Sequence, residues 1–296
     1  MRRALGILAA LVVSLALAAP ASAYVRTRSQ DGMFDVIWPD PNVTFTVMTG
    51  GPAVLPMDGL VAAATSAAAT WSDPALDSSI NYTITTSPDA PTDPAYDHVN
   101  TISFRTSSWD MPNYLPGELA VTTVWTIGGR IVDTDTEINA LDPDIMWGLL
   151  PDDPAMAETF TNEVDLQNCL THELGHALGL DHPCYLGAAA PEFETTNEGG
   201  PVPSCSDPNL PDSVRQATMY PSATRGNIDE RSLSPDEVLA LHDLYPAGRA
   251  PIVETASSSG GCDLGGAGTP SGSGAFAAAL LAGAILSARR RRILRR

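Results

Sequence analysis

The eleven residues from His172 to His182, HELGHALGLDH, constrain the fold of this chain more than any other stretch. They hold three of the five histidines in 296 residues. On an α-helix, four residues advance about 400° and rise roughly 6 Å, so His172 and His176 project from one face. His182 lies six residues farther on and can face the same point only if the helix ends first. We expect Gly179 to end it, because glycine adopts the left-handed conformation without steric cost.

Three imidazoles that face one point predict a catalytic zinc site. Zinc binds imidazole nitrogen at about 2.0–2.1 Å, and three protein ligands leave its fourth position to water. Glu173 follows the first histidine, and its carboxylate could take a proton from that water as the water attacks a polarised carbonyl. This chemistry is peptide hydrolysis. The alternative, a helix whose histidines are merely buried, is disfavoured by the added Gly179 and His182.

The stretch resembles the long zinc motif of the metzincin metallopeptidases. Downstream, Met219, Tyr220 and Pro221 resemble the methionine turn beneath the metal in that clan, most closely in its matrixin-like members. The resemblance implies an α+β fold with a five-stranded, mixed, twisted sheet and three main helices. A zinc cleft would lie between a larger upper and a smaller lower subdomain. The resemblance implies these zinc ligands: His172, His176 and His182.

Residues from about 33 to 246 suffice for one domain with a substantial core. Alternating and β-branched residues predict strands at 42–48, 80–86, 100–104, 119–126 and 131–139. Helices are predicted at 57–71, at 163–178 with Asn162 as its cap, and at 234–244. This order matches the metzincin plan.

That plan makes strand 119–126 the antiparallel edge of the cleft, where an extended substrate peptide would pair through main-chain hydrogen bonds. The cleft residues implied are Ala120, Val121, Thr122, Thr123, Tyr220 and Pro221. The chain departs from matrixins in a Pro-, Gly- and acid-rich insertion at 183–218 and in lacking the histidines of a structural zinc site. Asp133 and Asp135 could help bind calcium, although a solvated strand face also explains two alternating carboxylates.

The cysteines of an exported chain invite disulfides. Cys184 and Cys205 together close the long loop between His182 and Met219, so we expect them to pair and to contribute about 3 kcal/mol. Cys169 lies three residues before His172 on the same helix face. We therefore expect Cys169 to be a buried free thiol.

Both ends of the chain carry processing signals. Residues 1–23, with two arginines, an apolar run and Ala21-Ser22-Ala23, predict a secretory signal peptide followed by a catalytic domain at 24–246. A Gly/Ser/Pro-rich linker at 247–274 contains Cys262, and an apolar run with terminal arginines occupies 275–296. This tail resembles the C-terminal sorting tails of myxobacterial surface proteins. The resemblance implies a sorting or processing protease as a partner; the alternative is a permanent membrane anchor.

The formal net charge of −19, without any lysine, reflects acidic residues that all lie between Asp31 and Asp263. Such a surface repels phosphate backbones, so it argues against nucleic-acid partners and against membrane contact outside the tail. We expect a monomeric zinc endopeptidase that cleaves proteins or peptides. It would act at a bacterial cell surface or outer envelope, or after release into the medium. The alternative is a catalytically inactive metzincin fold that serves as an adhesion or interaction module.

Overall fold

The computed structural model of the protein describes residues 24–29, 31–50, 54–89, 93–109, 114, 117–187 and 189–252, together with the backbone of 278–284. The expected signal peptide (1–23), nearly all of the linker, Cys262 and the terminal arginines lie outside these residues. No helix in the described part of the chain has both the length and the apolar character needed to cross a membrane.

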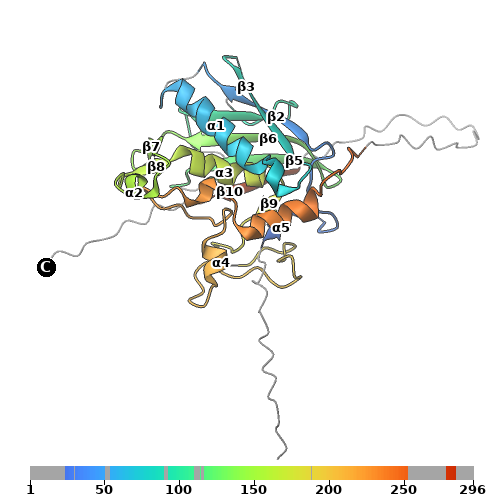
Figure 1. Ribbon diagram of the computed structural model, residues 1–296. Helices are drawn as coiled ribbons and strands as arrows, with labels where there is room; N and C mark the ends of the chain where they lie inside the picture. Colours follow the sequence, from blue (N-terminus) through green and yellow to red (C-terminus); the bar gives the residue numbers. More distant parts are fainter. Residues whose placement is uncertain are drawn as a thin grey trace, which may run out of the picture.

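A mixed β-sheet forms the upper layer of the molecule (Figure 1). Its domain strands are β2 (Asn42–Met48), β3 (Asn81–Ser87), β4 (Thr101–Arg105), β5 (Ala120–Ile127) and β6 (Arg130–Asn139). They lie in the order β5-β6-β4-β2-β3, and every neighbouring pair is parallel except β5 and β6. The turn between β5 and β6 uses Gly128 and Gly129, both with positive φ. The five predicted strands and the mixed sheet are confirmed, in agreement with an α+β class.

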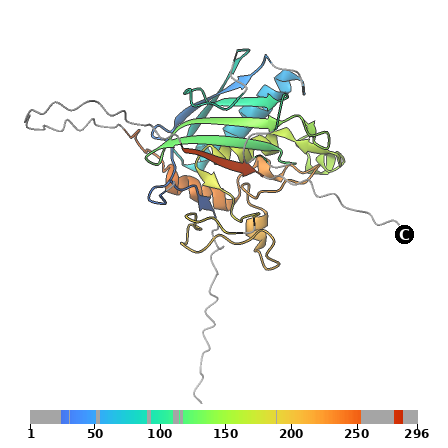
Figure 2. The same ribbon diagram turned by 180° about the vertical axis from the view of Figure 1, so that it is seen from behind.

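A sixth strand, β10 (Ala278–Ala284), comes from the apolar run near the C-terminus. It pairs antiparallel with β5 along seven residues, from Ala278 opposite Thr126 to Ala284 opposite Ala120 (Figure 2). The prediction that β5 is an open edge strand is therefore wrong for the full chain. A strand edge presents unpaired N–H and C=O groups, and another extended segment of the same chain satisfies them here.

Helix α1 (Met57–Trp71) and helix α3 (Leu166–His176) lie side by side on one face of the sheet (Figure 1). The buried face of α1 is lined by alanines at helical spacing, Ala63, Ala64, Ala67 and Ala68. Small side chains let the two helices approach closely. At the end of α1 the Trp71 indole donates a hydrogen bond of 2.8 Å to the Thr171 carbonyl on α3.

The start of α3 differs from the prediction. Residues Glu163–Asp165 form strand β8, which pairs in parallel with β7 (Met146–Gly148). Asp165, and not Asn162, caps the helix: its carboxylate accepts from the Asn168 N–H at 2.8 Å. The pairing of β8 with β7, which is not encoded locally, decides this boundary.

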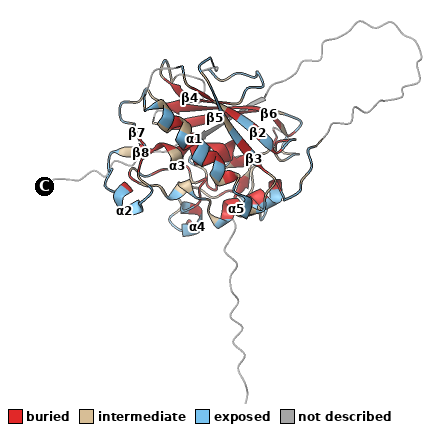
Figure 3. Ribbon diagram, turned by 45° about the horizontal axis from the view of Figure 1, so that its top comes forward, coloured by how far each residue is buried: buried red, intermediate tan, exposed pale blue. Residues whose placement is uncertain are grey.

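Helix α5 (Pro235–Leu244) lies below α3, and Ser234 and Glu237 form a capping box at its start. Burial is concentrated in the sheet strands and α3, while the outer faces of the short helices are exposed (Figure 3). The remaining elements are β1 (Val25–Arg26), η1 (Pro74–Leu76), α2 (Pro154–Ala157), β9 (Leu180–Asp181), α4 (Asp212–Arg215) and η2 (Asp229–Arg231).

Candidate metal centre

The three histidines of the motif converge beneath the sheet. Nε2 of His182 lies 3.2 Å from Nε2 of His172 and 3.1 Å from Nε2 of His176. Two nitrogens bound to one zinc at about 2.05 Å with tetrahedral angles would be about 3.3 Å apart. The observed spacing therefore fits three ligands of a single ion, and these side chains form a group that could hold a metal.

Hydrogen bonds to carbonyl groups set the tautomers of the first two ligands. Nδ1 of His172 lies 2.9 Å from the Thr218 carbonyl, and Nδ1 of His176 lies 2.9 Å from the Leu180 carbonyl. A carbonyl only accepts, so each Nδ1 carries the hydrogen and each Nε2 lone pair points to the centre. Burial lowers the pKa of His172 to about 3 and lowers the pKa of His176 and His182. Three neutral nitrogens that face one another are a donor set for a cation.

Gly179 brings the third histidine back to the first two. Helix α3 ends at His176, and Gly179 has a φ of +94°. A Cβ at this position would lie 1.9 Å from the Val36 carbonyl oxygen, so only glycine fits. Strand β9 follows and pairs with β1, which leaves His182 facing the pair on the helix.

Aromatic side chains donate hydrogen bonds to the last carbonyl groups of α3 and of the turn after it. Those of Leu174, Ala177 and Leu178 accept hydrogen bonds of 3.1, 2.7 and 2.7 Å. The donors are the Tyr82 hydroxyl, the Trp38 indole and the Tyr245 hydroxyl, respectively. Carbonyl groups at a helix end need such partners when they are buried. This network fixes the end of the helix that carries the ligands.

Glu173, which follows His172 on α3, is fully buried. The Thr122 hydroxyl on β5 donates to its Oε2 at 2.7 Å, while Oε1 has no partner among the described residues. Burial raises the pKa of Glu173 to about 8, against the lowering effect of the Thr122 hydrogen bond. A cation bound by the neighbouring histidines would lower this pKa. The sequence placed Thr122 in the cleft, but no sequence signal linked its hydroxyl to Glu173.

Met219 packs directly against α3. A Cβ on Gly175 would lie 2.2 Å from the Met219 sulfur, so the glycine between the two helical ligands admits the methionine. The Met219 N–H donates to Glu237 on α5 at 3.1 Å, and the preceding Thr218 carbonyl holds His172. The predicted methionine turn thus joins α3 to α5 under the histidines.

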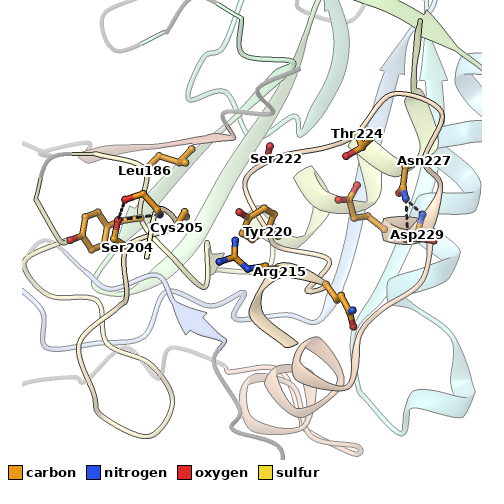
Figure 4. A pocket seen from close by; sticks show the side chains of 13 residues that line it. Leu186, Ser204, Cys205, Arg215, Tyr220, Ser222, Thr224, Asn227 and Asp229 are labelled. Atoms are coloured by element: carbon orange, nitrogen blue, oxygen red, sulfur yellow. Dashed lines mark hydrogen bonds between the residues drawn. The ribbon is translucent and has the colours of Figure 1, made fainter. Parts of the chain in front are cut away.

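The predicted cleft residues divide into two groups. Residues 120–123 are buried in β5, where Thr122 faces Glu173 and the register pairs the strand with β10. Tyr220 lines a cavity of about 600 Å³ (Figure 4), whose lining residues do not include the three histidines. Pro221 is buried. Residues of the 183–218 insertion also line this cavity, and sequence reasoning did not anticipate that.

The predicted disulfide closes the insertion. Cys184 and Cys205 form a disulfide with a Cα–Cα distance of 4.9 Å, and Cys169 is a buried free thiol. The disulfide packs with Leu210 and Val214 into a small apolar cluster of its own. The insertion therefore forms one wall of the cavity.

Asp133 and Asp135 hold the segment before β4 in place. Their carboxylates accept hydrogen bonds of 2.5 to 3.0 Å from backbone N–H groups of this segment. The donors are those of Ala95, Asp97, His98 and Thr101. Burial raises the pKa of Asp135 to about 6. Among the described residues these two carboxylates join no third metal-ligand group, so they anchor a loop and the predicted calcium site gains no support.

No protein-family model matches this chain, and a search of curated proteins finds no match. Any assignment of function therefore rests on the geometry of the residues themselves.

Proposed function

We propose that the protein is a zinc-dependent endopeptidase of the metzincin type, matrixin-like in its methionine turn. The observation that carries the proposal is the placement of Glu173. Its buried carboxylate belongs to the residue that follows His172 on α3, with one oxygen held by Thr122 and the other without a partner among the described residues. A cluster of histidines with only a structural role does not require a buried carboxylate at this position.

His172, His176 and His182 would hold the ion. Zinc supplies a Lewis acid that makes water acidic near neutral pH and polarises a peptide carbonyl. Hydrolysis adds the hydroxyl of water to the carbonyl carbon and returns a proton to the departing amine. Glu173 carries that proton on Oε1, and the Thr122 hydrogen bond at Oε2 keeps the carboxylate in position.

The substrate peptide would bind in extended form along β5. The pairing of β10 with β5 supports this, since it demonstrates that the strand accepts an antiparallel partner over seven residues. In the full chain the substrate competes with β10 for that edge. The acidic composition and the two terminal processing signals support export to the cell surface.

The test is Glu173→Gln in the purified protein, with Glu158→Gln at an exposed site as the matched control. We expect the Glu173 variant to lose about 100-fold or more in kcat against a peptide library. It should keep its zinc and its melting temperature, and the control should behave as the parent. His176→Ala should lose metal and activity together. Cleavage by Glu173→Gln at the parent rate would refute the assignment of the base. No cleavage by the parent, with surface binding intact, would favour the adhesion module instead.

A further inference from the structure

The cavity that Tyr220 lines lies between two parts of the chain. One wall belongs to the disulfide-closed insertion, with Tyr185, Leu186 and Ser204 (Figure 4). The other belongs to the segment after the methionine turn, from Tyr220 to Glu230. Its volume of about 600 Å³ is in the range of ligand pockets.

Two connections place this cavity within reach of the reacting centre. Tyr220 directly follows Met219, which packs against α3 between the helical histidines. Asn168 lies one helical turn before His172, roughly 6 Å along the axis, and its amide donates a hydrogen bond to Glu230. A side chain one residue past the cleaved bond could therefore enter the cavity.

Glu230 is an acid without a counter-ion at the inner part of this wall. It is half-buried, and among the described residues no arginine or histidine lies within 4.0 Å of its carboxylate. Burial, together with the nearby Asp229, Asp165 and Glu237, raises the pKa of Glu230 to about 8. Its carboxylate accepts a hydrogen bond from the Asn168 amide, whose own oxygen is buried without a partner among the described residues.

We propose that the cavity binds an arginine or lysine side chain of the residue that follows the cleaved bond, with Glu230 as its counter-ion. The inference rests on the proposed peptidase function. A guanidinium or ammonium group would supply the positive charge and the N–H donors that Glu230 and the Asn168 oxygen lack. An apolar side chain would leave the half-buried Glu230 carboxylate without a counter-ion, which is unfavourable.

Arg215 also lines the cavity, but it does not neutralise Glu230. Its side chain is exposed and donates a 3.0 Å hydrogen bond to the Asp207 carbonyl within the insertion. Exposed charges interact weakly, while a half-buried charge in an acidic neighbourhood interacts strongly. The charge that selects the ligand is therefore that of Glu230.

The experiment compares peptides that differ only after the cleaved bond, with arginine or its uncharged isostere citrulline. The parent should show a kcat/KM at least about tenfold higher for arginine. Glu230→Gln, which keeps an acceptor for Asn168, should bring this ratio close to one. Glu158→Gln, an exposed Glu outside the cavity, should keep the parent ratio. Equal rates in the parent, or an unchanged ratio in Glu230→Gln, would overturn the proposal.

Binding of n-butylguanidinium by calorimetry separates this proposal from the peptidase itself. The zinc-loaded parent should bind the probe, and Glu230→Gln should bind it at least about tenfold more weakly. A parent that cleaves no peptide but binds the probe through Glu230 would refute the peptidase function and retain the cation site. A parent that does not bind the probe would refute the cation site.

Discussion

Replacement of Gly179 by alanine tests the turn that assembles the three histidines. At a φ of +94° a non-glycine residue costs on the order of 1–3 kcal/mol. The new Cβ would also lie 1.9 Å from the Val36 carbonyl oxygen, and overpacking of this kind costs about 1–3 kcal/mol more. Taken together, we expect a loss of about 2–6 kcal/mol in the free energy of unfolding.

Gly128→Ala provides the matched control. Gly128 has a φ of +57°, and nothing lies within 4 Å of a Cβ there. It should lose only about 1–2 kcal/mol from backbone strain. At about 2–4 °C per kcal/mol for a domain of this size, Gly179→Ala should melt about 4–24 °C below the parent.

Differential scanning calorimetry and zinc titration together measure the outcome. The Gly179 variant should bind zinc more weakly, because the turn sets the position of His182 relative to the helix. Gly128→Ala should bind zinc as the parent does, since nothing lies within 4 Å of a Cβ at this position. Equal melting temperatures and zinc affinities for the two variants would refute the role of Gly179.

Three further outcomes follow from the structure. Thr122→Val should lower kcat about tenfold or more without loss of zinc, because a hydrogen bond to a buried charge contributes about 1.5–3 kcal/mol. Thr122→Ser keeps the hydroxyl and should retain most of the rate. Equal rates for the two variants would refute a role of this hydrogen bond in catalysis. Replacement of Cys184 and Cys205 by serine should reduce the free energy of unfolding by about 3 kcal/mol in chemical denaturation. An unchanged denaturation midpoint would show that the disulfide does not stabilise the protein. Truncation after Gly260 removes β10 and the terminal arginines, so it should release the protein into the medium and raise kcat/KM for long peptides. Unchanged cell association would refute the role of the tail as an anchor. Unchanged rates would refute competition between β10 and the substrate at β5.

Local patterns in the sequence were sufficient to bring the three histidines together and to predict most helices and strands. The 3.6-residue period puts His172 and His176 on one helix face, and Gly179 permits the turn that returns His182, so a short stretch encodes the ligand set. Strand β2 and helix α1 have the predicted bounds because their patterns of alternation and alanine spacing are local properties.

Contacts between residues distant in sequence determine the features that the sequence did not predict. The start of α3 depends on the pairing of β8 with β7, and the occupied edge of β5 depends on a strand more than 150 residues away. The hydroxyl that holds Glu173 comes from β5, and the cavity with Glu230 forms only where the insertion meets the segment after Met219. The pattern of hydrophobic residues along the sequence does not predict these contacts. The burial and the electrostatic surroundings of these side chains arise only when separate elements pack together.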